Sequence, residues 1–273
     1  MSPRRLTLVA GSGNLATVVA GAARAGGEPL QVIDIVGRND LAADVIEHIP
    51  LIRAADVVAA IRNFRTTHLV LAGAVHISDA EREGLAKAHG LGGWAAKRMG
   101  DIGLAGAILL YYRMHGIKLV GAQSIAPGLL APDGPIAGPL LDGETRRWAQ
   151  GALQLAKKIG TTDLGQSVVV SGTRPVAAED AGGTDALMLR VGALRAAGLT
   201  GNGSTPLILA KALKPRQPRF ADLPAIGRQT ILNAAEAGIS VVVVETGKSL
   251  VLEREALEAA AAAHSISVVG LAL

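Results

Sequence analysis

Acidic side chains surround a glycine pair in the second half of the chain, in the run EDAGGTDALM that begins at Glu179. Glu179 and Asp185 supply carboxylates, while Gly183 and Thr184 supply a turn that can bring such groups close to a substrate phosphate. Hard cations such as Mg²⁺ bind one or two carboxylates together with phosphate oxygens. The pattern therefore predicts a divalent-ion site on Glu179 and Asp185. The alternative is that Thr184 or Asp185 caps a helix beginning at Ala186.

Four cations lie within nine residues further along the chain, in the run KALKPRQPR that follows a predicted buried strand. Lysine offers a point charge and arginine a forked donor to phosphate oxygens, and both stabilise negative charge that develops at phosphorus. The run predicts a diphosphate-binding segment whose cations are Lys211, Lys214, Arg216 and Arg219. A solvated basic loop is the alternative, because runs of charge usually lie on the surface.

A further carboxylate, Asp222, stands in the proline-containing turn DLPAIG ahead of a predicted helix. This position suits either a metal ligand or a loop cap. The chain has no cysteine, no G-x-S-x-G motif and six histidines without zinc spacing, so covalent acyl transfer and zinc chemistry are disfavoured. Carboxylates and cations together favour metal-assisted attack of water on a phosphate ester or anhydride.

The glycine turn AGSGNLA near the start of the chain fits the pattern G-x-G-x-x-A. It follows a predicted strand and opens a predicted helix, a setting in which backbone N–H groups and the helix dipole hold a phosphate. We therefore expect Gly11, Ser12, Gly13 and Asn14 to bind the substrate phosphate. Asp34, 21 residues beyond Gly13, is placed to accept from a ribose hydroxyl in a dinucleotide site. A glycine turn without any cofactor is the remaining interpretation.

Short apolar runs alternate with helical patterns over the first 125 or so residues, as in βαβ units. The expected strands are Leu6–Ala10, Leu30–Ile35, His68–Ala72 and Ile117–Val120. The expected helices are Asn14–Ala25, Ala54–Asn63, Ala80–Lys87 and Ile102–His115. Because the strand runs are almost wholly apolar, they predict a parallel sheet covered on both faces. The sequence therefore predicts an α/β fold with a Rossmann-like N-terminal domain over residues 1–130.

Proline and glycine concentrate in residues 126–143 and interrupt the periodicity, which predicts an interdomain linker over 131–143. Helical and strand-like patterns alternate again beyond it. The expected helices are Glu144–Ile159, Ala186–Ala196, Arg228–Ala237 and Arg254–His264. The expected strands are Ser167–Ser171, Pro206–Lys211, Ser240–Val244, Ser249–Leu252 and Ser267–Leu271. We therefore expect a second, mixed α/β domain over residues 144–273 that carries the carboxylates and cations described above.

Composition narrows the kinds of partner. The 273-residue chain has a net charge of +4 and only 2% aromatic residues, so it lacks the stacking platforms of single-strand nucleic-acid binders. We expect no nucleic-acid partner. No apolar run reaches the roughly 18 to 20 residues of a membrane span, and the start does not resemble a secretory signal. These features favour a cytoplasmic protein.

Six motifs occur in one collinear order along the chain: AGSGNLA, LAGAV, GD, EDAGGTDALM, LAKALKPRQ and DLPAIG. Together they resemble the UDP-2,3-diacylglucosamine pyrophosphatase family of lipid A biosynthesis, the LpxI type. The resemblance runs over essentially the whole chain. It is stronger in the second half, where GTDA, K-x-x-K-P-x-Q and DLP-x-IG-x-x-T are distinctive in combination.

The resemblance implies a Mg²⁺-dependent hydrolase, with Mn²⁺ as the alternative ion. Such an enzyme cleaves the diphosphate of UDP-2,3-diacylglucosamine, a nucleotide-linked glycolipid, to UMP and 2,3-diacylglucosamine 1-phosphate. The resemblance also implies a homodimer in the cytoplasm that contacts the inner-membrane surface peripherally. Two alternatives are a divergent binder of nucleotide-linked lipid without activity, and an NAD(P)-dependent oxidoreductase that uses the glycine turn.

The family motifs assign roles residue by residue. Asp185 matches the GTD aspartate and Asp222 the DLP aspartate, so both are expected in catalysis and metal binding, with Glu179 as a further metal ligand. Lys211 and Lys214 match the lysines of K-x-x-K-P-x-Q and are expected to stabilise charge in catalysis. The residues expected to bind substrate in this half are Gly183, Thr184, Gln217 and Arg219.

Overall fold

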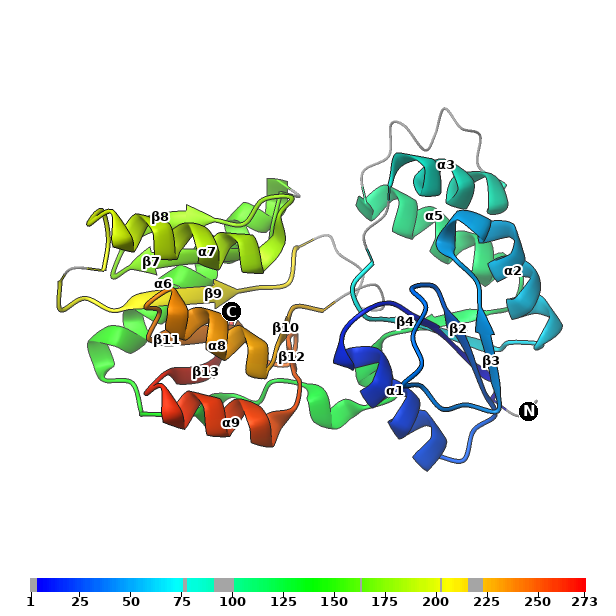
Figure 1. Ribbon diagram of the computed structural model, residues 1–273, viewed down its shortest axis with the longest axis horizontal. Helices are drawn as coiled ribbons and strands as arrows, with labels where there is room; N and C mark the ends of the chain where they lie inside the picture. The colour runs from blue at the N-terminus through cyan, green and yellow to red at the C-terminus, as the bar shows by residue number, and fades with distance from the viewer. Residues whose placement is uncertain (1–3, 76–77, 91–100, 163, 202, 216–222) are drawn as a thin grey trace. The chain divides into compact units, whose positions relative to one another are not determined.

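The computed structural model describes residues 4–75, 78–90, 101–162, 164–201, 203–215 and 223–273. Within them the chain divides into two compact units, the first ending at Gly128 and the second beginning at Leu129 (Figure 1). Each unit contains helices and a sheet of its own. The predicted fold class, α/β with a parallel-sheet N-terminal domain and a second, mixed α/β domain, is confirmed.

Five parallel strands form the sheet of the first unit, in the order β3-β2-β1-β4-β5. This is the strand order of the Rossmann fold. The strands are β1 (Leu6–Ala10), β2 (Leu30–Asp34), β3 (Val45–His48), β4 (His68–Ala72) and β5 (Lys118–Val120). Every residue of β1 and β2 is buried, which explains why these strands are mostly apolar in the sequence. The buried polar side chains Thr7 and Gln31 hydrogen-bond each other across the two strands at 2.8 Å.

Helices cover both faces of this first sheet. They are α1 (Asn14–Ala25), α2 (Ala54–Asn63), α3 (Asp79–Ala88) and α5 (Asp101–Met114). Helices α2 and α5 pack on the face that carries Val9, Ile33 and Leu69. Helix α1 contacts β1, β2 and β4 on the opposite face of the sheet, to which the alternate residues of each strand point. Helix α3 packs on α2. Since α1 begins directly after Gly13, the glycine turn lies at the carboxyl end of β1.

Six strands form the main sheet of the second unit, in the order β6-β13-β11-β9-β7-β8. Its parallel centre consists of β9 (Leu207–Lys211), β11 (Val241–Glu245) and β13 (Ser267–Leu271). Antiparallel strands flank it, namely β6 (Gly134–Ala137), β7 (Ser167–Ser171) and β8 (Arg174–Ala178). A separate parallel pair is formed by β10 (Ala225–Ile226) and β12 (Leu250–Val251).

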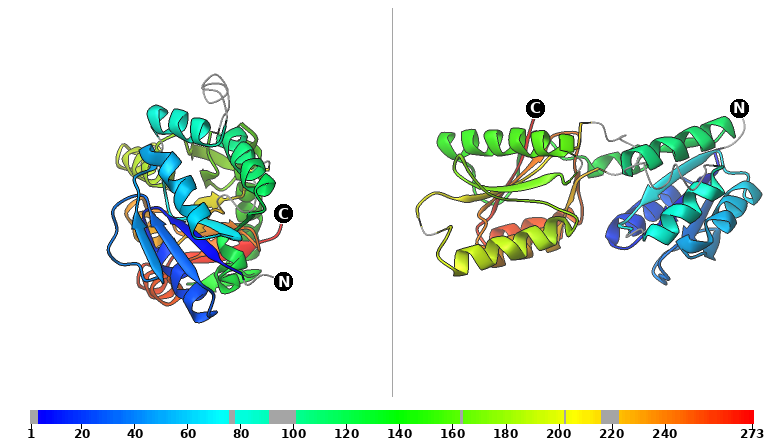
Figure 2. Two further views of the ribbon diagram at one scale, coloured as in Figure 1. Left: turned by 90° about the vertical axis from the view of Figure 1, so that its right-hand side faces the viewer. Right: turned by 90° about the horizontal axis from the view of Figure 1, so that it is seen from above.

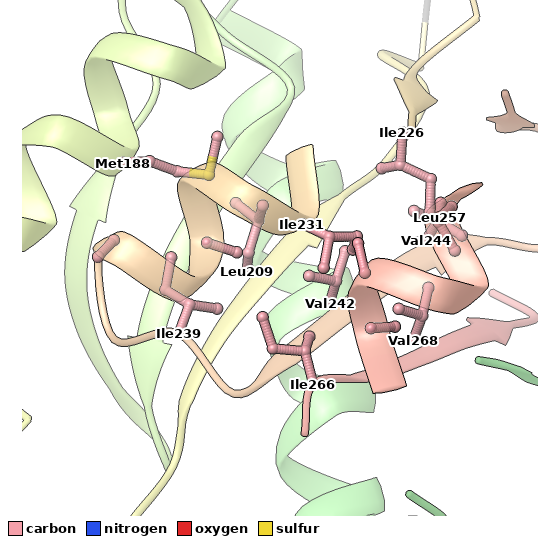
Figure 3. Packing of buried hydrophobic residues seen from close by; sticks show 14 of the residues in the cluster. Met188, Leu209, Ile226, Ile231, Ile239, Val242, Val244, Leu257, Ile266 and Val268 are labelled. Carbon is pink, nitrogen blue, oxygen red and sulfur yellow. The ribbon is translucent and has the colours of Figure 1, made fainter. Parts of the chain in front are cut away.

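The second sheet lies between two helical layers (Figure 2). One layer is α6 (Gly143–Ile159), and the other consists of α7 (Gly183–Ala196), α8 (Arg228–Glu236) and α9 (Arg254–Ala263). Leu209 and Val242 belong to the core under α7–α9 (Figure 3), whereas Val243 belongs to the core under α6. Side chains alternate along a strand, so Lys211 projects on the α7–α9 face and Glu245 on the α6 face.

Strands β3, β6, β8 and β10 are absent from the sequence prediction. The first three are edge strands with partly exposed residues, so their sequences lack a clear apolar pattern, and β10 has two residues. Strand β6 lies inside residues 131–143, the segment expected to be a linker, and pairs with β13. Pro135 is tolerated there because an edge strand has N–H positions without a ladder partner. The proline and glycine content of this segment therefore reflects an edge strand of the second unit.

Candidate active site

One edge of the second sheet brings together residues that are far apart in the sequence. Strand β9 ends at Lys211, which pairs with Ser167 at the start of the antiparallel strand β7. Glu179 follows β8, and its backbone N–H donates to Ser167 O at 2.9 Å. Strand pairing thus places the predicted residues Lys211 and Glu179 at the same end of three neighbouring strands, with Ser167 between them. This end of the strands is called the sheet edge below.

Thr184, in the first turn of α7, connects this edge to the glycine pair. Its Oγ1 lies 3.2 Å from Glu179 Oε1 and 3.2 Å from Ser167 Oγ. The other Glu179 oxygen accepts from the backbone N–H of Gln166 at 3.0 Å. A Cβ on Gly165 would lie 2.6 Å from Glu179 Cβ, so glycine is needed for this close approach. Glu179 is therefore held by protein donors at both oxygens.

Asp185 is exposed in the first turn of α7, where its negative charge suits the helix dipole. Its Oδ1 accepts from Asn233 Nδ2 of α8 at 2.9 Å. The helix begins at Gly183, not at Ala186, and its N-cap residue Gly182 makes no side-chain cap bond. The alternative in which Thr184 or Asp185 acts as N-cap is therefore wrong, and Asp185 keeps a solvent-facing carboxylate.

Lys211 is only 7% exposed, which is unusual for a lysine. Its Nζ donates to Ala225 O of β10 at 2.9 Å. Lys214 is half-buried, and its Cα would lie 3.2 Å from a Cβ built on Gly160. The other predicted residues of this region lie outside the described residues, namely Gln217, Arg219 and Asp222, together with Arg216 of the same basic run.

Glu245 ends β11 on the α6 face, is fully buried, and was missed by the sequence analysis. Its oxygens accept from Lys157 Nζ at 2.9 and 3.1 Å, from Lys248 Nζ at 2.7 Å and from the backbone N–H of Leu213 at 3.2 Å. Burial raises the pKa of this carboxyl, but the two ammonium groups outweigh burial and hold the pKa below its ordinary 4.5. Glu245 thus anchors the beginning of the basic run to the sheet.

The described residues do not complete a metal centre. Among them, no three His, Cys, Asp or Glu side chains are grouped so that they could hold an ion. Glu179 gives its oxygens to Thr184 and Gln166, which leaves Asp185 as the exposed carboxylate of this pair. Asp222 lies outside the described residues. The described residues therefore support a chemical role for Lys211 and its neighbours at the sheet edge, and they do not by themselves form a metal centre.

The glycine turn of the first unit has the predicted strand-turn-helix setting, but protein groups cover its carbonyls. The Arg38 guanidinium donates to Gly11 O at 2.8 Å, to Gly13 O at 2.5 Å and to Thr17 Oγ1 at 2.8 Å. Ser12 exchanges backbone hydrogen bonds of 2.9 and 2.8 Å with Ala74. These contacts fix the shape of the turn. Asn14 begins α1 directly after it.

Asp34 does not have the free carboxylate that a dinucleotide site requires. It is 1% exposed. Its oxygens accept from the backbone N–H groups of Val36 at 3.0 Å, Gly37 at 3.1 Å and Arg38, and His48 Nδ1 lies 2.7 Å away. Four donors match the roughly four lone-pair sites of a carboxylate. The expected bond from Asp34 to a ribose hydroxyl is therefore not supported, which argues against the NAD(P)-dependent alternative.

The close packing of the glycine turn leads to a prediction about the stability of the first unit. A Cβ on Gly11 would lie 2.5 Å from Ala74 O and 2.9 Å from Val75 Cγ2. We expect Gly11→Ala to lower the free energy of unfolding by about 1–3 kcal/mol, because backbone must move to relieve the overlap. Gly21→Ala is the matched control. Gly21 lies within α1 with no atom within 4 Å of an added Cβ, so this change is expected to stabilise by up to about 1 kcal/mol. Urea unfolding followed by circular dichroism measures both, and an unaffected Gly11→Ala protein would contradict the close approach.

Two family models match the chain, one to each unit. The model described as the LpxI N-terminal domain matches residues 5–129, and the model described as the LpxI C-terminal domain matches residues 132–269. The chain belongs to the LpxI family. The two LpxI domain matches meet close to the division between the units at Gly128 and Leu129.

A curated member of the LpxI family is similar to this chain. It is the UDP-2,3-diacylglucosamine pyrophosphatase LpxI of Caulobacter vibrioides, which is 37% identical over 177 residues. The match covers 64% of this chain and 63% of the length of that relative.

Two solved structures match parts of the chain. A glycinamide-RNase-transformylase T from Mycobacterium tuberculosis has 18% identity and a TM-score of 0.25, over 64% of this chain and 44% of that one. An N5-carboxyaminoimidazole ribonucleotide synthetase from Thermotoga maritima has 12% identity and a TM-score of 0.26, over 66% and 42%. TM-scores this low support no inference about fold or function.

Proposed function

We propose that this LpxI-family chain hydrolyses the diphosphate of UDP-2,3-diacylglucosamine, giving UMP and 2,3-diacylglucosamine 1-phosphate. Family membership and the name of the Caulobacter relative support the reaction. The structural observation that carries the proposal is the buried Lys211 at the sheet edge, in register with Ser167 and close in the fold to Thr184 and Glu179.

The proposed step is the attack of water on the phosphorus next to uridine. A bond forms between the water oxygen and phosphorus, the bond from that phosphorus to the bridging oxygen breaks, and the sugar 1-phosphate leaves with the electron pair. Lys211 would offset the charge that builds on the phosphate oxygens, and its low exposure makes that interaction stronger than it is in water. Asp185, as an exposed carboxylate, would orient the water and accept its proton.

A divalent ion, Mg²⁺ or alternatively Mn²⁺, is part of this proposal. Its support is the chemistry of the donor set, because Asp185 and Asp222 are carboxylates and the substrate contributes diphosphate oxygens. When bound, the ion would reduce the charge repulsion between the diphosphate and an incoming water. Lys214 and the remaining basic run would add positive charge around the same diphosphate.

Release of UMP from UDP-2,3-diacylglucosamine in detergent tests the reaction and its metal dependence together. We expect UMP with added Mg²⁺, loss of turnover with excess chelator, and recovery when Mg²⁺ is restored. Full turnover in chelator would remove the ion from the proposal and keep the hydrolase. No UMP from folded protein under any condition, combined with retained binding of the substrate, would favour the divergent binder instead.

Two proposals concern the partners of this protein, one drawn from the substrate and one from the family resemblance. Its two acyl chains place it at a membrane surface, so we propose a cytoplasmic protein that contacts the inner membrane peripherally. In the described part of the chain no helix is both long and apolar enough to cross a bilayer. Leu110 and Met114, 58% and 76% exposed on α5, offer apolar side chains for such contact. We also propose a homodimer. Cosedimentation with anionic vesicles and analytical ultracentrifugation test these two proposals, and a monomer that stays in the supernatant would contradict both.

A further inference from the structure

A pocket of about 410 Å³ lies along the edge strand β5 of the first sheet. Its lining includes Arg4, His68 and Lys118, together with the polar residues Gln123 and Ser124. His68 begins β4 and Lys118 begins β5, and the two residues are paired across the strands. They mark the amino ends of these parallel strands, whereas the glycine turn follows the carboxyl end of β1. The pocket is therefore distinct from the glycine turn.

The charge of this pocket is strongly one-sided. Among the described residues its lining contains no carboxylate. Arg4 pairs with Glu28 through an Nη1–Oε1 distance of 3.1 Å. Arg4 Nε, however, is shielded from solvent and has no hydrogen-bond partner among the described residues. Two cations, Arg4 and Lys118, thus line one pocket beside His68, and Glu28 offsets part of their charge.

We propose that this pocket binds a small phosphate-bearing molecule, with its phosphate between Arg4, His68 and Lys118. A guanidinium presents several N–H donors to phosphate oxygens, and an ammonium adds a point charge. Pockets for small ligands span roughly 300–1,000 Å³, so this volume leaves room for a phosphate and a small organic group. The proposal goes beyond hydrolysis of the lipid-linked diphosphate, because none of these residues belongs to the edge that carries Lys211.

His68 provides a second readout of binding. Burial lowers the pKa of His68 below its ordinary 6.5, the charges of Arg4 and Lys118 lower it further, and Glu28 acts in the opposite direction. His68 Nδ1 also lies 3.0 Å from Thr67 Oγ1. A phosphate placed beside the ring favours the imidazolium, which raises the pKa. Binding near neutral pH should therefore take up protons from the buffer.

Titration calorimetry with glycerol 3-phosphate, and with glycerol as the control without phosphate, tests the proposal on the full chain. We expect wild type to bind glycerol 3-phosphate but not glycerol. Lys118→Gln removes an exposed ammonium and should weaken binding about tenfold, the effect of one charged contact. Lys87→Gln is the matched control, because Lys87 is also exposed but lies on α3 outside the pocket lining. Proton uptake, measured in buffers of different ionisation enthalpy, should disappear in His68→Asn.

Two outcomes would overturn this site. One is the absence of glycerol 3-phosphate binding to folded wild type. The other is an equal loss of affinity in Lys118→Gln and Lys87→Gln, which would mean attraction by overall charge and not by the pocket. Because binding is read directly, a protein without pyrophosphatase activity can still support the proposal, and an active enzyme can still refute it.

Discussion

Lys211→Met is expected to lower kcat/KM for UMP release by about 10²–10³-fold, the size of effect seen when a preorganised group that stabilises transition-state charge is removed. The reason for this large effect is the position of the Lys211 ammonium. Lys211 ends β9, is 7% exposed and reaches Ala225 O at 2.9 Å, so its ammonium is held in position before any substrate arrives. Methionine keeps an unbranched side chain, one atom shorter than that of lysine, and removes the charge. Steady-state kinetics with UDP-2,3-diacylglucosamine measures the effect.

Lys158→Met is the matched control for this prediction. Lys158 is exposed on α6, a helix that packs on the other face of the second sheet, and its loss changes the net charge by the same amount. We expect turnover within about twofold of wild type, since an exposed charge away from the site is screened. If Lys211→Met is folded and turns over like Lys158→Met, Lys211 plays no part in the reaction even though the wild type is active.

The buried strands were predictable because burial on both faces leaves a mostly apolar run. Leu6–Ala10 and His68–Ala72 are observed with the predicted bounds, and so is Ser267–Leu271 in the second sheet. Edge strands have no such constraint. Residues Arg174–Ala178 form β8 although the sequence contains a proline and an arginine, because pairing with β7 determines the strand.

The candidate site was predictable in its residue types but not in its contacts. Glu179, Thr184 and Lys211 stand out in sequence as charged or polar groups next to glycines and strand ends, and the structure brings Glu179 and Thr184 within hydrogen-bond distance. Ser167 carries no sequence signal, since its position between these groups depends on antiparallel register. Asp34 misled for a related reason. Its spacing from the glycine turn matches a dinucleotide site, but the backbone N–H groups of the loop that follows it use both of its oxygens.

Glu245 could have been identified from the sequence as a candidate functional residue, because it is the charged residue that ends the apolar run of a central parallel strand. Such positions lie at the carboxyl edge of the sheet, where α/β proteins place functional groups. What the sequence could not supply is the identity of its partners. Lys157 lies 88 residues away, and the bond to Leu213 N exists only because β9 and β11 are neighbours.

The Glu245 cluster leads to the second large expected effect. Replacing Lys157 and Lys248 together by methionine should destabilise the second unit by about 3 kcal/mol at pH 7, the lower end for a buried charge left without its partner. The lower end applies because the lysine side chains are 28% and 39% exposed. Glu245→Gln should cost less, about 1–2 kcal/mol, since the amide oxygen can still accept from Leu213 N and both lysines can turn to solvent.

The pH dependence separates this explanation from simple loss of packing. In wild type the folded-state pKa of Glu245 is lowered, so its stabilisation is present above the unfolded-state value near 4.5 and is lost as pH falls through the folded-state pKa. In the double lysine variant, desolvation without cations raises that pKa, so the penalty is present at pH 7 and disappears toward pH 4.

The triple variant that adds Glu245→Gln should be more stable than the double variant at pH 7, because no charge is then buried. Denaturant unfolding of all four proteins at pH 7 and pH 4.5 measures these differences, and a triple variant no more stable than the double variant would show that the buried carboxylate carries no uncompensated charge.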